Sequence, residues 1–314
     1  PSAGHGQVIL PGWALPRPMA TYSTDLKVSA AALSAVALWG LAFPLIQIGL
    51  EDFSPIVLGF LRFALAAAAM AVVMFSRHTI GEMASVLRAE WKPLLVLGLL
   101  YVTVPNAAQN IGLEHGTSSV ASVIQSSGPV MTMFFAALLL KERVTTMKGL
   151  GTVVALAGTV MLVAAGGLTT GDDGFVSNLL ILLSAASYGL AWVSAKRMLE
   201  RNPPMLVIGL SIILGTAMLA ISIPLESGPK AVFDMASVAN LLVLGVLCAG
   251  LSSVLYLGAV EREEVSRMAF FIYLMPVFAS VFAWAIMDER IELWTVLCAA
   301  IIATGVAVAT RQVR

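Results

Sequence analysis

One long apolar segment occurs twice in this chain. Residues 117–143 begin with polar side chains, continue as an apolar run interrupted by a proline and end in charged residues, and residues 264–290 repeat the pattern. In each copy the proline, Pro129 or Pro276, precedes a glutamate by 13 residues. The copies are 147 residues apart, a period far longer than the unit of a solenoid. A duplicated half of this length is typical of membrane carriers built from two repeats.

Two shorter matches support the duplication. The sequence LLVLG occurs at Leu94–Gly98 and again at Leu241–Gly245, also 147 residues apart. The related sequences WGLAF, at Trp39–Phe43, and YGLAW, at Tyr188–Trp192, are 149 residues apart. The near-constant offset predicts two related halves with the same order of elements.

The composition is that of a membrane protein. Hydrophobic residues make up 59% of the chain and charged residues 11%, whereas soluble domains carry about 25% charged residues. The mean hydropathy is +0.93. Apolar runs of about 20 residues recur, each long enough to span a bilayer core of about 30 Å. The net charge is zero, so no basic footprint indicates nucleic acid as a partner. We therefore expect a lipid bilayer around the protein.

We predict an all-α membrane protein with ten transmembrane helices. These helices are expected at residues 28–49, 55–75, 93–113, 118–140, 147–166, 176–198, 204–224, 239–259, 265–287 and 293–310. The predicted organisation is a disordered N-terminal tail, residues 1–26, a first repeat, residues 27–166, a periplasmic linker, residues 167–175, and a second repeat, residues 176–314. Pro129 and Pro276 interrupt equivalent helices, where each frees a carbonyl group and predicts a kink. Such a kink serves either as a hinge or only in packing.

Lysine and arginine predict the orientation. If the N-terminus lies in the cytoplasm, 14 of the 18 Lys and Arg residues fall in cytoplasmic segments and only Lys230 and Arg290 fall outside. This bias follows the positive-inside rule. It places both termini in the cytoplasm of a multi-pass protein of the inner (plasma) membrane. Because five helices per half is an odd number, the second half must be inverted relative to the first.

Arg62 is the only charged residue deep inside a predicted helix. It lies seven residues after Pro55, roughly 10 Å along the helix. A charge at this depth is costly and is commonly functional. Arg62 either anchors a carboxylate or phosphate of a substrate, or it bonds to helix carbonyls and extends its side chain towards the surface.

Neutral polar and aromatic residues gather on several predicted helices. Trp39 and Phe43 share one helix face, as do Tyr188 and Trp192, since each pair is four residues apart. The other candidate substrate-binding residues are Tyr101, Asn106, Asn110, Gln125 and Tyr273. An apolar pocket with a few hydrogen-bonding groups suits a small neutral or zwitterionic solute. The alternative for each residue is interhelical bonding, at about 0.6 kcal/mol per bond. As a set, these residues favour a cavity.

Acidic residues and histidines are located only near the ends of the predicted helices or in loops. A membrane carboxylate or histidine is the usual proton relay of a proton-driven carrier, so the sequence does not support proton coupling. Metalloenzymes and hydrolases need clustered histidines and carboxylates, which are missing from the sequence. We therefore predict no enzyme activity, no metal and no cofactor.

The ordered set of motifs resembles the EamA family of the drug/metabolite transporter superfamily. The resemblance covers residues 28–310 and rests on WGLAF, on FLRFALAAAA at Phe60–Ala69, and on the two proline-to-glutamate endings. It implies a ten-helix bundle with a central cavity formed by the first four helices of each half. The matching family positions are Trp39, Arg62, Pro129, Glu142, Pro276 and Glu289. Family members export amino acids and related metabolites, and others carry sugars, nucleotides, vitamins or drugs.

Three functions follow from these observations. The favoured one is a carrier, working by alternating access as a monomer or homodimer, that exports amino acids or related zwitterionic or anionic metabolites. The alternative is an importer or facilitator of a vitamin, nucleoside or nucleotide-like solute on the same scaffold. A membrane enzyme or a receptor that transports nothing would need clustered catalytic groups or an added soluble domain, and the sequence contains neither.

Overall fold

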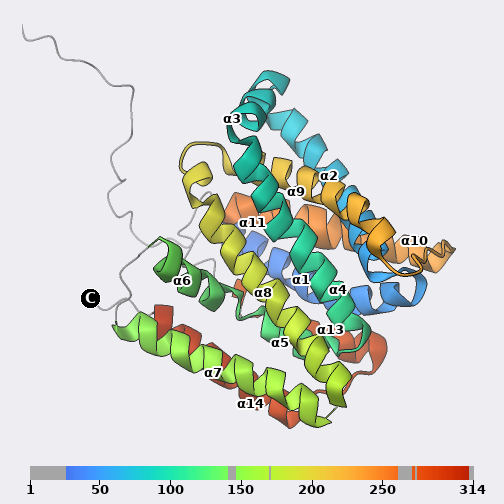
Figure 1. Cartoon of the computed structure of the whole chain (residues 1–314), viewed down its shortest axis with the longest axis vertical. Coiled ribbons are helices and arrows are strands. Elements are labelled where there is room, and N and C mark those ends of the chain that lie inside the picture. Colours follow the sequence, from blue (N-terminus) through green and yellow to red (C-terminus); the bar gives the residue numbers. More distant parts are fainter. Residues whose placement is uncertain (1–25, 141–145, 170, 261–270, 273, 311–314) are drawn as a thin grey trace, which may run out of the picture.

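The structure is a bundle of helices. The computed structural model describes residues 26–140, 146–169, 171–260, 271–272 and 274–310 (Figure 1). The helical elements in these ranges are α1 Leu26–Asp52, α2 Pro55–Arg77, α3 Ile80–Gly98, η1 Leu99–Thr103, α4 Val104–Glu114, α5 Ser118–Gln125, α6 Gly128–Leu139, α7 Thr146–Thr169, α8 Gly171–Leu199, α9 Pro204–Ser222, η2 Ile223–Leu225, α10 Met235–Leu242, η3 Val243–Leu251, α11 Ser252–Val260, α13 Met275–Met287 and α14 Leu293–Thr310. The all-α prediction is confirmed for this part of the chain.

Seven helical segments are long and apolar enough to cross a membrane. By length and composition these are Leu26–Asp52, Pro55–Arg77, Ile80–Glu114, Ser118–Leu139, Asp173–Leu199, Pro204–Leu225 and Met235–Ala259. Shorter apolar helices, Gly149–Met161, Met275–Met287 and Leu293–Gly305, fall within the other three predicted spans. The helices thus follow the predicted order, while the number of spans and their orientation remain predictions.

The third predicted helix begins earlier than expected. The prediction started at residue 93, whereas α3 starts at Ile80. A capping box causes this early start: the Thr79 hydroxyl accepts from the Glu82 N–H at 3.2 Å, and the Glu82 carboxylate accepts from the Thr79 N–H at 2.8 Å. Non-helical dihedral angles at Glu90, φ −120° and ψ 19°, separate this first part from the apolar part of α3.

Both prolines of the repeated segment lie at the start of a helix. Pro129 is the second residue of α6, after α5 has ended at Gln125, and Pro276 is the second residue of α13. Proline is tolerated in a first helical turn because the N–H that it lacks would be unpaired there. The chain therefore changes direction just before Pro129. The hinge role of both prolines stays a prediction.

The two halves of the chain are packed together by equivalent pairs of helices. Helix α1 packs against α11 and α13 of the second half, and α8 packs against α4 and α6 of the first half. Helix α2 contacts α9 and η3, whereas α9 contacts α2, α3 and η1. Helices α7 and α14 lie side by side at one edge of the bundle (Figure 1). Exchanging the halves reproduces this set of contacts.

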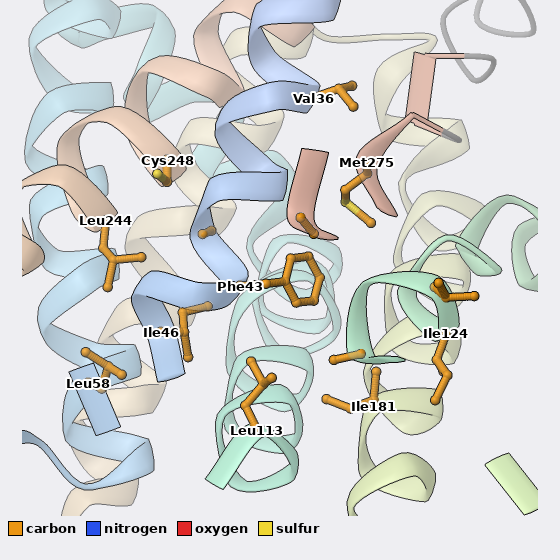
Figure 2. Packing of buried hydrophobic residues seen from close by; sticks show 14 of the residues in the cluster. Val36, Phe43, Ile46, Leu58, Leu113, Ile124, Ile181, Leu244, Cys248 and Met275 are labelled. Atoms are coloured by element: carbon orange, nitrogen blue, oxygen red, sulfur yellow. The ribbon is translucent and has the colours of Figure 1, made fainter. Parts of the chain in front are cut away.

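The apolar core is continuous across the halves. One cluster joins residues of α1, α2, α4, α5, α8, η3 and α13. Figure 2 shows Phe43 inside this cluster, with Leu113 and Met275 around it. A second cluster is built mainly from α2, α3, α8 and α9. The polar residues described next lie where helices of both halves meet.

Candidate functional site

An aromatic group forms where η1 and α8 meet. The ring centroid of Tyr101 lies 5.6 Å from that of Tyr188 and 5.9 Å from that of Trp192, with nearly perpendicular planes in both pairs. These edge-to-face geometries are the favourable ones for aromatic rings. Tyr188 and Trp192 are one turn apart on α8, so both present rings on the same face. Tyr101 enters from the π-helix η1, an element that is frequent at functional sites.

A second aromatic pair adjoins the first. Trp39 of α1 and Tyr256 of α11 have ring centroids 4.8 Å apart. Tyr256 and Ser253 of α11 both lie near the Tyr101 hydroxyl, and the Ser253 hydroxyl itself donates to the Ala249 carbonyl at 2.6 Å. We call Trp39, Tyr101, Tyr188, Trp192 and Tyr256 the aromatic cluster. It draws on both halves of the chain.

Arg62 of α2 adjoins this cluster. Its side chain is only 6% exposed. Its guanidinium lies close enough to the Tyr188 hydroxyl and the Cys248 thiol to interact with them electrostatically. The Cζ atom lies 5.1 Å from the ring centroid of Phe63. Its Nε and Nη1 atoms have no hydrogen-bond partner among the described residues. Leaving buried polar donors unpaired costs about 1–3 kcal/mol, and more for a charged group. Arg62 therefore presents an unused anion-binding group.

Asn106 of α4 offers the complementary chemistry. Its side chain is fully buried, and its Nδ2 donates to the Val102 carbonyl at 2.6 Å. Its Oδ1 atom is buried without a partner in the described part of the chain. The amide also neighbours the Tyr188 hydroxyl. Unpaired donors on Arg62 and an unpaired acceptor on Asn106 thus both lie near Tyr188.

Three of the predicted site residues that the structure describes lie outside this group. Phe43 is buried in the apolar core (Figure 2), so its ring contributes packing. Asn110 is fully buried one turn beyond Asn106 and donates to the Pro55 carbonyl at 2.9 Å. Gln125 ends α5, and its Oε1 is buried and unpaired among the described atoms. Tyr273 and Glu142 lie outside the described residues.

Glu289, the other glutamate of the repeated ending, joins the two halves. Its carboxylate accepts from the backbone N–H groups of Ser118 at 3.2 Å and Ser119 at 2.9 Å, at the start of α5. Glu226 has a similar role, since it accepts from the Ser54 hydroxyl at 2.6 Å and the Ile56 N–H at 2.9 Å at the start of α2. Carboxylates stabilise helix N-termini through unpaired N–H groups and the helix dipole. Both glutamates thus connect the second half to the first.

Three site neighbours were not in the predicted binding set. They are Tyr256, which pairs with Trp39, Cys248, which lies near Arg62, and Ser253, which lies near Tyr101. The repeat offset was the signal that could have found two of them. Adding 147 to Tyr101 gives Cys248, and adding 147 to Asn106 gives Ser253. Groups of three or more His, Cys, Asp or Glu suited to a metal ion do not occur within the described ranges.

The fold and the buried polar site define a multi-pass membrane transporter. The profile of the EamA-like transporter family matches residues 26–164 and again residues 176–311. The chain therefore belongs to the EamA-like transporter family, and the two matches correspond to its two halves.

Individual relatives agree with this assignment. An uncharacterized transporter of Archaeoglobus fulgidus is 26% identical over 284 residues, which cover 88% of this chain and 96% of that protein. A Streptantibioticus cattleyicolor protein named "Probable terminal-alkyne amino-acid exporter" is 28% identical over 257 residues, covering 81% of this chain and 83% of that protein. A solved crystal structure covers 90% of this chain and 96% of its own, with a TM-score of 0.64 and 22% sequence identity. At that identity it shows the fold alone.

Proposed function

We propose that the protein is a secondary transporter that exports amino acids or related zwitterionic or anionic metabolites across the inner (plasma) membrane by alternating access. The single observation that carries the proposal is Arg62. Its guanidinium is buried at the meeting of both halves, with two nitrogen atoms lacking partners among the described residues. A solute carboxylate would satisfy these donors in a charge-assisted, bidentate manner.

The neighbours of Arg62 suit the rest of such a solute. The unpaired Oδ1 of Asn106 would accept from an ammonium or amide donor. The rings of Tyr101, Tyr188 and Trp192 would surround an apolar or cationic side chain. The Streptantibioticus relative, whose name includes amino-acid export, supports the same solute class at low identity.

The packing of the halves supports alternating access. Exchange of the halves reproduces the contacts that α1 and α8 make with α11, α13, α4 and α6, which supports two units related by an approximate two-fold axis. With five spans in each half, this axis lies in the membrane plane and the repeats are inverted. The 14 Lys and Arg residues assigned to one side then place both termini in the cytoplasm. Rocking of one half against the other would expose the buried site to each side in turn.

Counterflow in proteoliposomes tests the proposal. Vesicles containing the purified protein are preloaded with one unlabelled solute from a panel of amino acids, carboxylic acids, nucleosides and vitamins, and uptake of the labelled solute is measured. We expect exchange of amino acids or related carboxylates that is missing in protein-free vesicles. Net efflux from energised cells would then establish export. Counterflow restricted to nucleosides or vitamins would favour an importer, and its absence for every solute would contradict the proposal.

A further inference from the structure

A pocket lies at the end of the molecule that the lysine and arginine distribution places outside. Its volume is about 530 Å³, and it is lined by the ends of α1 and α4, the start of α2 and the segment after α9. Its wall contains Glu114, Glu226 and Lys230 beside apolar residues such as Phe53 and Ile111. Glu226 caps α2 and Lys230 donates to the Glu51 carbonyl, so Glu114 and the positive charge of Lys230 are the two opposite charges that this wall offers to a zwitterionic solute.

A line of polar side chains on α4 runs from this pocket to the buried site. Asn106, Asn110 and Glu114 follow one another at intervals of four residues, so they share one helix face. Asn106 neighbours Tyr188 in the aromatic cluster, while Glu114 lines the pocket. Asn110 lies between them, fully buried, with an Oδ1 atom that has no partner in the described structure.

Helix α2 forms the opposite side of this line. Pro55 and Ile56 line the pocket, and Arg62 lies roughly 10 Å further along the helix. Between them, Gly59 has no side chain: a Cβ atom added there would lie 3.3 Å from Nδ2 of Asn110 and 3.9 Å from Cβ of Asn106. The two helices are joined at this level by the Asn110 bond to the Pro55 carbonyl.

We propose that the seam between α2 and α4 is the path by which the solute passes between the buried site and the outer pocket, and that Asn110 closes it in this structure. The inference rests on the proposed function. It adds a route for the solute and a second binding position, in the outer pocket. The absence of a side chain at Gly59 lets α2 and α4 pack closely at this level, with Leu219 of α9 also nearby. Opening therefore requires that Asn110 release Pro55 and that the two helices separate, after which the Asn110 amide can bond to the passing solute.

Substitution of Gly59 tests the path through transport. Gly59→Val places two methyl groups in the seam, and overpacking of about 1–3 kcal/mol at the moment of passage would lower flux by about fivefold or more. Solute binding at Arg62 should persist, measured as the solute-induced rise in melting temperature. Gly258→Val on α11 is the matched control, because no atom lies within 4 Å of a Cβ added there. Wild-type flux in Gly59→Val would overturn the inference.

Cysteine labelling tests the path without relying on flux or on Gly59. In a background lacking Cys248 and Cys298, Asn110→Cys is compared with Leu113→Cys, using a membrane-impermeant methanethiosulfonate applied from outside. Leu113 is fully buried in the apolar core and lies nearer the end of α4 than Asn110 does. Depth alone would therefore favour labelling of position 113.

The two positions should nevertheless label in the opposite order. We expect the cysteine at 110 to react and the one at 113 to stay protected. Protection of position 110, or equal reaction at both positions, would overturn the path. Labelling at 110 in a protein that exchanges no solute of the panel would instead contradict the proposed function and leave the path standing.

Discussion

Equivalent glycines bring α1 and α8 close to their partners in the opposite half. A Cβ atom added at Gly40 of α1 would lie 2.6 Å from Cβ of Phe278 and 2.9 Å from the nitrogen of Ala279. One added at Gly189 of α8 would lie 2.8 Å from both Cβ of Met131 and the nitrogen of Thr132. Gly40 and Gly189 are 149 residues apart, and each partner pair is 147 apart. Both halves thus use the same close approach.

The π-helices show the same equivalence. Element η1 covers Leu99–Thr103, and the residues 147 positions later lie within η3, Val243–Leu251. In each, the N–H of the residue after the π-helix bonds to a carbonyl five residues earlier, Val104 to Leu99 and Ser252 to Leu247. The backbone has therefore kept its local irregularities in both copies.

The polar side chains are not equivalent. Tyr101 in the first half corresponds to Cys248 in the second, Asn106 to Ser253, and Arg62 to Ile212 at an offset of 150. The first half therefore supplies the charge and the buried amide, while α8 of the second half supplies Tyr188 and Trp192. The repeat therefore provides a similar scaffold in both halves, whereas the charge and the amide of the proposed binding site occur in only one copy.

The largest effect is expected when Arg62 is replaced by an apolar residue. Arg62→Met should lower flux by about 100-fold, a loss of about 2.7 kcal/mol of binding to the solute's charge. Thermal stability should hold or rise, because removing an unpaired buried charge relieves a cost of about 1–3 kcal/mol or more. Flux in proteoliposomes and melting temperature in detergent are the measurements.

Ile212→Met is the control at the equivalent position of the second half. It conserves side-chain volume at a buried site, so it should leave flux unchanged and cost less than about 1.5 kcal/mol of stability. Equal flux losses in the two variants would show that the halves share the binding role.

Replacing either of the equivalent glycines, Gly40 or Gly189, by alanine should lower the free energy of unfolding by a similar amount. Gly40→Ala and Gly189→Ala each insert a Cβ against backbone and Cβ atoms of the facing helix, and we expect a loss of about 1–3 kcal/mol from each. Thermal unfolding in detergent measures the effect. Gly258→Ala, which meets no atom within 4 Å, should instead stabilise its helix by about 0.5–1 kcal/mol. A large loss at only one of the two sites would disprove the equivalence of the scaffold.

The smallest expected effect concerns the contact that joins the two copies in the site. Tyr188→Phe removes the hydroxyl beside Asn106, and the loss of a hydrogen bond of about 0.5–1.5 kcal/mol from that hydroxyl to the solute should lower flux by about two- to tenfold. In a double-mutant cycle with Asn106→Ala, the two losses should be less than additive. Additive losses would mean that the two groups act on the solute independently.

The fold was largely predictable because its signals are local in the sequence. Apolar runs and turn residues located the helices, and the repeat offset paired the halves before any contact was known. The early start of α3 was missed, since the capping box of Thr79 and Glu82 was not considered. The family and the all-helical architecture were predicted correctly from ordered motifs.

The site was predictable only in part. Arg62 was found because a charge within an apolar run is conspicuous, and Tyr188 and Trp192 because their spacing places them on one face. Phe43 has the same spacing from Trp39, yet it packs in the core. Its helix faces α13 at that level, and helical spacing alone does not reveal which neighbour a face meets.

The amino-acid sequence alone established a membrane-embedded helical protein made of two related halves, because hydropathy and repetition are properties of the chain itself. The meeting of Arg62, Asn106 and Tyr188, and the capping of α5 by Glu289, came from the packing of the halves. Close approaches at glycines such as Gly40 and Gly189 bring helices of the two halves together. Those approaches depend on the shapes of both partners, which no single stretch of the chain contains.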